Sequence, residues 1–389
     1  MNLNEIQAEL RDQHLDGWLF FDHHRRDPLA YRVLGLGPEL DPTRRWFYLI
    51  PASGEPRGLV HKIEPAVLDA VPGDKAKYSS WSGLLQGLGK LLTGCGRIAM
   101  QYSPQCVIPY VSLVDAGTLE QVRNLGIEVA SSADLIQQFE ARWDEAKLAS
   151  HMEAGRRVDS IRREAFELVS DRMHSGSSIS EWKVKQFILS RFAAEGLVTD
   201  HGPIVGVNEN AANPHYEPTS ASSRPLRTGD LLLIDMWAKL AQPHSVYYDI
   251  TWTGFCGAQA PPEVERVFRI VCEARDRAIR RVQSAIQEGE PLRGFEVDDA
   301  ARSYIREQGF PDAFVHRTGH SIGEEVHGAG ANMDNLETHD ERRIIPWTCF
   351  SIEPGIYLNA FGIRSEVNVF VDVDKAVVTG EIQDSLVLI

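Results

Sequence analysis

The sequence predicts an α+β protein of two domains, a smaller α/β domain followed by a larger domain in which one pattern occurs twice. The chain has 389 residues, which exceeds the usual size of one core, and 43% of them are hydrophobic. Short apolar runs alternate with helix-like stretches in the first part, whereas long amphipathic helices follow it. We therefore expect one domain over residues 1–143 and a second over residues 144–389.

The first domain is predicted from short strands separated by helices. Apolar runs typical of strands occur in GWLFF, WFYLIP, GLV and RIAMQ. Helix-like stretches occur in IEPAVLDAV and SLVDAGTLEQVRNLG. The segment FFDHHRRDP, at residues 20–28, follows the first strand and is interpreted as a solvated turn. This pattern favours a small layered α/β domain.

The first half of the second domain begins with a long helix in DEAKLASHMEAGRRVDSIRREAFELV. A second helix is expected from Glu181, opened by a capping box that pairs Ser178 with Glu181. A loop with His215 follows. The strands LLLIDMW and YYDITWTGF come next, and they carry Asp235 and Asp249.

The second half repeats this order. Helices are predicted in PPEVERVFRIVCEARDRAIRRVQSAI and FEVDDAARSYIREQG, and a histidine-rich loop follows them. The strands FSIEPGIYL and GIRSEVNVFVDV then carry Glu353 and Glu366. The acids lie 14 residues apart in the first half and 13 apart in the second. We interpret the two halves as an internal pseudo-duplication that brings four carboxylates together.

Acidic residues inside apolar strands point to a bound cation. Alternation over residues 363–371 puts Arg364, Glu366 and Asn368 on one face of the strand. Burying an ionised carboxylate without a partner costs several kcal/mol or more. Four carboxylates and one imidazole would approximately neutralise two divalent ions, and oxygen-rich ligation suits Mn²⁺, Zn²⁺ or Co²⁺. Two such ions, about 3.5 to 4 Å apart, would lower the pKa of a shared water.

The segment HRTGHSIGEEVHG, at residues 316–328, supplies the histidines. His316 and His320 are four residues apart and would share one face of a helix. However, the zinc-peptidase motif with this spacing needs Glu at the place of Arg317, and the glycines in the segment disfavour a long helix. We therefore expect a loop in which the glycines allow tight turns.

Composition excludes several classes of partner. The formal net charge of −15 argues against nucleic acid or an anionic membrane surface as a partner. The first residues contain no basic region followed by an apolar run, and no apolar stretch reaches about 18 residues. Five cysteines without a CxxC pair indicate reduced thiols and a cytoplasmic protein.

Six segments together resemble one known family. PHYEP, LLLIDMW, YYDITWTGF, HRTGHSIGEEVHG, SIEPGIY and GIRSEVNVFV occur in the order and approximate spacing of the M24 metallopeptidases, the prolidase, aminopeptidase P and creatinase group. The resemblance covers essentially the whole chain. It implies a pita-bread catalytic domain with internal pseudo-duplication, preceded by a smaller α/β N-terminal domain of the creatinase type.

The resemblance also implies roles for individual residues. The implied metal ligands are Asp235, Asp249, His320, Glu353 and Glu366, with Asp249 and Glu366 bridging two ions, for which Mn²⁺ is expected and Zn²⁺ or Co²⁺ are alternatives. The implied catalytic residues are His215, His327 and Glu353, the last as the base. His316 matches a pocket histidine of the group. Arg364 matches a position that holds a substrate carboxylate, and an equal alternative makes it the partner of a ligand carboxylate.

The expected activity is hydrolysis of the Xaa-Pro amide bond, in dipeptides first, by a hydroxide that bridges the two ions. Alternatives are an Xaa-Pro aminopeptidase that acts on longer peptides, and a lyase or C–N hydrolase of the same fold. A catalytically silent binding module is disfavoured because every implied ligand is present. The group commonly forms homodimers through the N-terminal domain, so residues 20–28 could instead cover the site of a neighbouring subunit.

Some residues depart from the usual pattern of the group. Met236 and Trp237 stand where small residues are frequent, and the segment before Asp249 is longer, with an added loop at 240–245. Ser321 and Gly328 replace the more frequent Gly and Glu. We expect Met236, Trp237 and the loop at 240–245 to reshape the substrate pocket.

Overall fold

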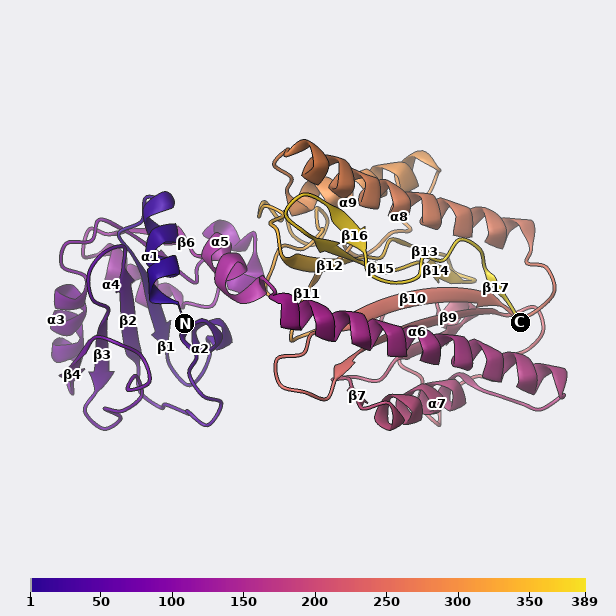
Figure 1. Cartoon of the computed structure of the whole chain (residues 1–389), viewed down its shortest axis with the longest axis horizontal. Helices are drawn as coiled ribbons and strands as arrows, with labels where there is room; N and C mark the ends of the chain where they lie inside the picture. Colours follow the sequence, from indigo (N-terminus) through magenta and orange to yellow (C-terminus); the bar gives the residue numbers. More distant parts are fainter. Residues whose placement is uncertain (1) are drawn as a thin grey trace. The chain divides into compact units, whose positions relative to one another are not determined.

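The computed structural model describes residues 2–389 and divides into two compact units, Met1–Ala141 and Arg142–Ile389. Figure 1 labels the helices and strands of both units. The fold is mixed α/β, with separate sheets in each unit. No helix among residues 2–389 is long and apolar enough to span a membrane.

The first unit is built on a sheet with strand order β4-β3-β2-β1-β5-β6. Its strands are β1 (Gly17–Asp22), β2 (Trp46–Pro51), β3 (Arg57–His61), β4 (Asp74–Tyr78), β5 (Arg97–Met100) and β6 (Glu128–Ser131). Its helices are α1 (Leu3–Asp12), α2 (Pro28–Leu34), α3 (Trp81–Leu91), α4 (Ala116–Arg123) and α5 (Ala133–Ile136). β1 and β2 are buried on both faces, which explains their unbroken apolar runs. The strands predicted in GWLFF, WFYLIP, GLV and RIAMQ are confirmed.

One predicted helix of this unit is wrong. Residues 63–71, IEPAVLDAV, form successive turns rather than a helix. Pro65 and Pro72 bound the segment so closely that too few residues remain for a stable helix. The turns are sufficient to bury Leu68 and Val71 against the sheet, and Ile63 stays 67% exposed.

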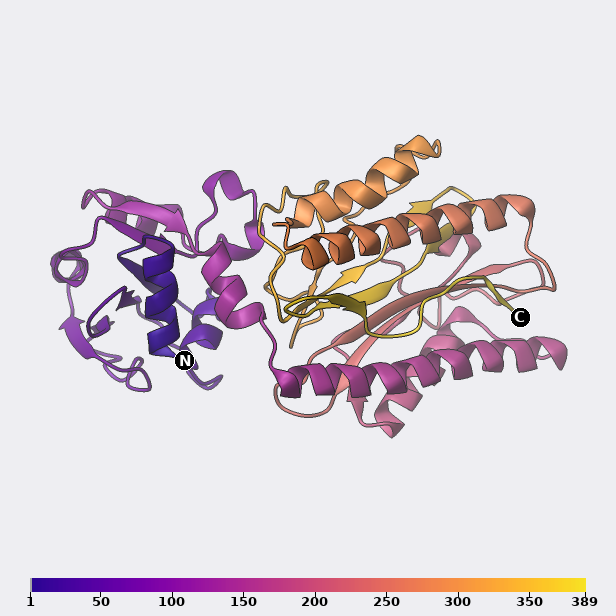
Figure 2. The same cartoon turned by 45° about the horizontal axis from the view of Figure 1, so that its top comes forward.

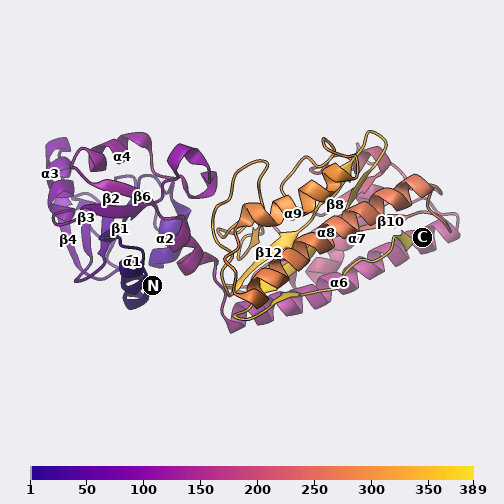
Figure 3. The same cartoon turned by 90° about the horizontal axis from the view of Figure 1, so that it is seen from above.

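The second unit contains long helices on two sides of its strands (Figures 1 and 2). The helices are α6 (Glu145–His174), α7 (Glu181–Ala194), α8 (Pro262–Glu288) and α9 (Gly294–Glu307). α6 packs on β9 (Leu231–Leu240) and β10 (Tyr248–Phe255), and α8 packs beside α9 and against the later strands (Figure 3). All four helices agree with the predicted ones.

The strands of the second unit form three sheets. The first has the order β17-β10-β9-β7, and β8 also pairs with β9; the second has the order β11-β12-β15-β16; the third pairs β13 with β14. The remaining strands are β7 (Leu197–Val198), β8 (Ile204–Val207), β11 (Ser321–Ile322), β12 (Thr348–Ile352), β13 (Gly355–Tyr357), β14 (Gly362–Arg364), β15 (Val367–Val371), β16 (Ala376–Val378) and β17 (Val387–Leu388). One apolar cluster lies under α6 and α7, and another lies under α8 and α9.

The expected capping box of α7 is wrong. The N-cap residue is Ser180, its side chain makes no capping bond, and Glu181 is the first residue of the helix. The Glu181 carboxylate instead accepts hydrogen bonds from the backbone N–H groups of Val207 and Arg224. Hydrogen-bond donors from distant parts of the chain therefore engage the Glu181 carboxylate, and it does not cap its own helix.

The predicted strand over residues 362–373 is interrupted. β14 ends at Arg364 and β15 begins at Val367, so Ser365 and Glu366 lie between them. Arg364 and Glu366 nevertheless stay on one side, because both contact the Thr251 hydroxyl, at 2.9 and 2.7 Å. The predicted face is confirmed even though the strand is not continuous.

Candidate metal centre

Four acidic residues and one histidine come from five separate segments of the second unit. Asp235 lies in β9 and Asp249 in β10, Glu353 follows β12, Glu366 lies between β14 and β15, and His320 precedes β11. Asp235, Asp249, His320 and Glu366 are at most 8% exposed. The sheets that contain β10 and β15 meet with their acidic residues facing one another. The Asn368 side chain of β15 joins them, since it accepts a hydrogen bond from the backbone N–H of Asp249 and donates one to its carbonyl oxygen.

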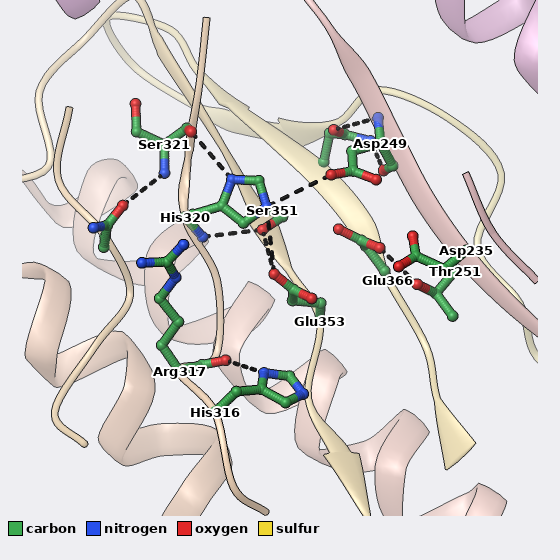
Figure 4. A network of polar contacts seen from close by, with 12 residues as sticks. Asp235, Asp249, Thr251, His316, Arg317, His320, Ser321, Ser351, Glu353 and Glu366 are labelled. Atoms are coloured by element: carbon green, nitrogen blue, oxygen red, sulfur yellow. Dashed lines mark hydrogen bonds and ion pairs between the residues drawn. The ribbon is translucent and has the colours of Figure 1, made fainter. Parts of the chain in front are cut away.

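The closest group consists of Asp249, His320 and Glu366, each of which offers one donor atom within 4.8 Å of the others. His320 Nε2 lies 3.5 Å from Asp249 Oδ2 and 3.5 Å from Glu353 Oε1. Figure 4 shows these side chains pointing toward one another from different strands and loops. The predicted ligands of the second half of the domain therefore lie close to Asp249 of the first half, with His320 between Asp249 and Glu353.

Asp235 lies at the edge of this group and pairs with Arg364. The Arg364 guanidinium donates to the Asp235 carboxylate and to the Thr251 hydroxyl, and it also donates to the Tyr357 hydroxyl at 3.1 Å. Arg364 is only 3% exposed. Each of its three nitrogens donates to a group of the protein, which favours the alternative in which Arg364 is the partner of an acidic side chain.

The carboxylates resist ionisation in these surroundings. Burial raises the pKa of Asp235 to about 6 and that of Asp249 to about 7, while the positive charge of Arg364 opposes both shifts. Burial and the neighbouring carboxylates also raise the pKa values of Glu353 and Glu366. The charge of Arg364 is thus too small to balance the cluster, and additional positive charge would stabilise it.

Two unpaired oxygen atoms show where an additional positive charge could bind in the cluster. Asp249 Oδ1 and Glu366 Oε1 are buried and have no hydrogen-bond partner within residues 2–389. Unpaired buried oxygens are costly unless a ligand completes them. Carboxylate oxygens with one imidazole nitrogen form a donor set that suits divalent ions such as Mn²⁺, Zn²⁺ or Co²⁺. The residues present therefore fit a metal centre.

The orientation of His320 is set by its own loop and by β12. Its backbone N–H donates to Ser351 Oγ at 3.0 Å, and its Nδ1 donates to the carbonyl oxygen of Ser321 at 3.1 Å. Nε2 is left facing the carboxylates (Figure 4). Burial lowers the pKa of His320, which favours the neutral form that can bind a metal ion.

The glycines of this loop differ from the expectation. Gly319, Gly323 and Gly328 do not have a positive φ, so tight turns are not the reason for them. A Cβ at Gly319 would lie 1.8 Å from the carbonyl oxygen of Ser351. Gly319 is therefore needed for the close approach of the loop to β12.

Residues of α9 that the sequence analysis missed also hold the loop. The Asp298 carboxylate accepts hydrogen bonds from the N–H and hydroxyl groups of Thr318. Arg302 pairs with Asp298 and donates to the carbonyl oxygens of Phe314 and His316. No local motif marks this pair, although its i, i+4 spacing is typical of an ion pair on one helix face.

His316, His327 and His215 occupy three different environments. Both ring nitrogens of His316 are engaged, with the Tyr357 hydroxyl at 2.6 Å and the Arg317 carbonyl at 2.7 Å. The His327 ring lies edge-on to His320, with centroids 4.4 Å apart, and this neighbour together with burial lowers its pKa to about 3. His215 lies on an exposed loop and contributes to that lowering, so it is near His327.

Thr251 and Tyr357 are further residues of the site that sequence reasoning missed. Thr251 is two residues after Asp249 in β10, so period-two alternation could have identified it. Tyr357 closes the segment EPGIY and connects His316 with Arg364. No pattern in the sequence distinguishes Tyr357 from an ordinary strand tyrosine.

Residues 149–372 match the profile of the family described as metallopeptidase family M24. A putative Xaa-Pro aminopeptidase of Mycoplasma pneumoniae is 30% identical over 236 residues, which are 59% of this chain and 61% of that protein. The Xaa-Pro dipeptidase of Pyrococcus furiosus is 26% identical over 278 residues, which are 65% of this chain and 72% of that protein. The chain thus spans less than two thirds of the Mycoplasma relative.

Among solved structures, the dipeptidase PepE of Mycobacterium ulcerans aligns with a TM-score of 0.72 and 23% identity, over 99% of this chain and 96% of that chain. This likeness concerns the fold. The family profile covers more than half of the 389 residues. On this evidence, the chain belongs to metallopeptidase family M24.

Proposed function

We propose that this chain is a dinuclear-metal-dependent hydrolase that cleaves the Xaa-Pro amide bond, with dipeptides as preferred substrates. The observation that carries the proposal is the buried cluster around His320, in which Asp249 and Glu366 retain unpaired oxygens. The names of the Mycoplasma and Pyrococcus relatives support the type of bond. The name of the Pyrococcus relative supports the dipeptide.

The proposed metal ligands are Asp235, Asp249, His320, Glu353 and Glu366, with Asp249 and Glu366 shared between two ions. Mn²⁺ is the proposed metal because oxygen donors dominate the set. When bound, the two ions would lower the pKa of a water molecule and polarise the scissile carbonyl. Thr251 would hold Glu366 in place, since its hydroxyl donates to Glu366 Oε2 at 2.7 Å.

Glu353 is the proposed general base. Its Oε1 accepts a hydrogen bond from Ser351 Oγ at 3.2 Å, which fixes the carboxylate beside His320. From this position Glu353 would accept the proton of the attacking water. The prolyl nitrogen of the substrate carries no hydrogen, so it must receive a proton as it leaves, and Glu353 is the residue that holds one.

His327 and His215 are the proposed catalytic histidines. The low pKa of His327 keeps its ring neutral at physiological pH, with one N–H available as a donor. That N–H would stabilise the oxyanion that forms when the carbonyl is attacked. His215, on the exposed loop near His327, would hold the substrate during this step.

His316 and Arg364 are proposed to shape the substrate pocket through Tyr357. Arg364 donates to the Tyr357 hydroxyl, and His316 bonds the same hydroxyl. We assign Arg364 to positioning Asp235 rather than to binding the substrate carboxylate, because its guanidinium is buried among protein acceptors.

We further infer an internal pseudo-duplication and a homodimer. The duplication is supported by the matching order of elements, since α6 and α7 precede the pair β9–β10 as α8 and α9 precede the pair β12–β15. The N-terminal unit, proposed to be of the creatinase type, would mediate the dimer. Residues 20–28 are interpreted as a solvated turn, with cover of a neighbouring subunit's site as the alternative. Free thiols at all five cysteines support a cytoplasmic location.

The experiment that tests the proposal is a product assay with Mn²⁺-loaded protein. Ala-Pro and Leu-Pro should be cleaved, whereas Ala-Ala should be cleaved much more slowly. Cleavage of Ala-Pro-Ala without cleavage of Ala-Pro would replace the dipeptidase by an aminopeptidase. No cleavage of any peptide by the metal-loaded protein would refute the proposal.

A further inference from the structure

Trp237 lies beside the carboxylate cluster on the strand face that carries Asp235. The two residues are two positions apart in β9, so their side chains point to the same side of the sheet. In the antiparallel register Trp237 is directly opposite Asp249 of β10. Directly opposite side chains share one face and lie close together. The Trp237 indole therefore borders the proposed metal site, and it is half-buried there.

A second acidic residue outside the cluster is fixed by this indole. Trp237 Nε1 donates to Asp200 Oδ1 at 2.8 Å, and the backbone N–H of His201 donates to the same oxygen at 2.9 Å. The other oxygen, Oδ2, lies 3.3 Å from Nδ1 of the exposed His201 ring. Asp200 follows β7, and 44% of its side chain is exposed to solvent.

Asp200 remains charged and lies close enough to act on the site. Burial would raise its pKa, but hydrogen bonds from Trp237 and His201 outweigh that effect and lower it. Its charge contributes to the raised pKa of Asp249 and opposes the lowering of the pKa of His327. The hydrogen bond from Trp237, which lies opposite Asp249 in the strand register, fixes the Asp200 carboxylate next to this face of the site.

Glu324 and Asp200 both act on the charge of Lys239, but Glu324 also forms a direct ion pair, whereas Asp200 reaches Lys239 only through its longer-range charge. Glu324 Oε1 lies 3.1 Å from Lys147 Nζ. Within residues 2–389, no lysine or arginine nitrogen lies within salt-bridge distance of Asp200. An exposed carboxylate bonded to an indole N–H also makes the face of that indole more negative, which strengthens its attraction for a cation.

We propose that Trp237 and Asp200 form the subsite for the side chain of the residue before the scissile bond, and that this subsite favours lysine and arginine. The inference rests on the proposed function. The Cα of that residue is bonded to the carbonyl carbon that is attacked, so its side chain starts beside the metal ligands. A long cationic side chain extends from there along the Trp237 ring, and its charged end reaches Asp200.

The test compares kcat/KM for Lys-Pro, norleucine-Pro and Glu-Pro. Norleucine has the four-carbon chain of lysine without the ammonium group, so the ratio of Lys-Pro to norleucine-Pro isolates the charge. The wild-type protein should prefer Lys-Pro roughly tenfold and should disfavour Glu-Pro. The preference should decrease as the ionic strength increases. A ratio of one or below would overturn the inference.

Variants separate the two residues of the subsite. Asp200→Asn keeps an acceptor for the indole and removes the charge, so the ratio should fall to about one while norleucine-Pro is still cleaved. Trp237→Phe keeps the aromatic face and loses the bond to Asp200, so the ratio should be intermediate. Asp374→Asn, at an exposed position on another surface loop, should keep the wild-type ratio.

The inference and the proposed function fail in different ways. An unchanged ratio in Asp200→Asn would overturn the inference and leave the peptidase assignment intact. If the metal-loaded wild-type protein cleaved none of the dipeptides, the proposed function itself would be overturned, and the inference with it.

Discussion

Asp22 and Asp249 are buried carboxylates of the two units, and their surroundings are opposite. Asp22, at the end of β1, is 1% exposed and accepts hydrogen bonds from three backbone N–H groups of the following turn and from the Tyr31 hydroxyl. Asp249, in β10, is 4% exposed, faces Glu366 and His320, and has one oxygen without a partner.

The difference separates structural from functional burial of charge. Donors that the protein itself supplies stabilise Asp22, so this residue orders the turn at residues 22–27. Asp249 lies among other acids and keeps one buried oxygen without a partner, which a cation would stabilise. Burial alone therefore does not identify a site, whereas burial with missing donors does.

The largest expected effects come from replacing Asp249 or Asp22 by asparagine, which removes one negative charge. Asp249→Asn should reduce metal content and lower kcat/KM for Ala-Pro by at least about 1000-fold, because the proposed shared ligand is lost. Asp22→Asn should leave metal content and activity per folded molecule unchanged. It should instead lower the free energy of unfolding by about 2 kcal/mol. Elemental analysis, dipeptide kinetics and urea unfolding check these outcomes, and equal metal content in both variants would contradict the distinction.

Metal removal should affect the two positions differently as well. Mn²⁺ at about 1000 times its Kd should stabilise the wild-type protein by about 4 kcal/mol relative to chelated protein. In the chelated state, Asp249→Asn should be at least as stable as the wild type, because it removes one of several mutually repelling charges. Urea unfolding with and without chelator measures both. Destabilisation of the chelated protein by Asp249→Asn would indicate a structural role like that of Asp22.

The strands, and the side on which Arg364 and Glu366 lie, were predictable from the sequence because they depend on local periodicity. Alternation over residues 363–371 was sufficient to predict that Glu366 and Arg364 share one face. The resemblance of six segments to the family implied His320 as a ligand, and the structure brings it close to Asp249 and Glu366.

Contacts between distant segments were not predictable. The Arg364–Asp235 pair joins residues 129 positions apart, and its strength depends on how the sheets meet. Glu181 failed as a capping residue for the same reason, since its donors come from residues 207 and 224. Local patterns do not contain such distances, so Asp200 was also missed.

His151 of α6 extends the comparison to a buried base. Its Nδ1 donates to the Tyr247 carbonyl oxygen and its Nε2 accepts from Thr379 Oγ1, both at 2.7 Å, so it is fully paired like Asp22. Burial lowers its pKa from 6.5 to about 4. The unfolded chain therefore binds a proton first as the pH falls, and stability present above pH 6.5 is lost between pH 6.5 and pH 4.

The expected loss is about 3 kcal/mol in chelated protein. His151→Gln, which cannot titrate, should show a correspondingly smaller decrease in unfolding free energy over this pH range, measured by urea titration at several pH values. Identical pH profiles for the two proteins would remove His151 from the account.

The smallest effect concerns the two departures in the histidine loop. Ser321 Oγ accepts a hydrogen bond from the Gly330 N–H, and a Cβ at Gly328 would lie 2.9 Å from that oxygen. Gly328→Ala should therefore cost about 1 to 2 kcal/mol of stability, and Ser321→Gly should recover part of it. Additive unfolding free energies in the double variant would show that the two positions are independent.

The central claim is that the buried carboxylates form a two-metal site. The most direct measurement is the number of Mn²⁺ ions bound per chain at equilibrium, determined by elemental analysis of the dialysed wild-type protein. The account predicts about two ions per chain, as two ions bridged by Asp249 and Glu366 require. Wild-type protein that binds no Mn²⁺, Zn²⁺ or Co²⁺ would contradict it.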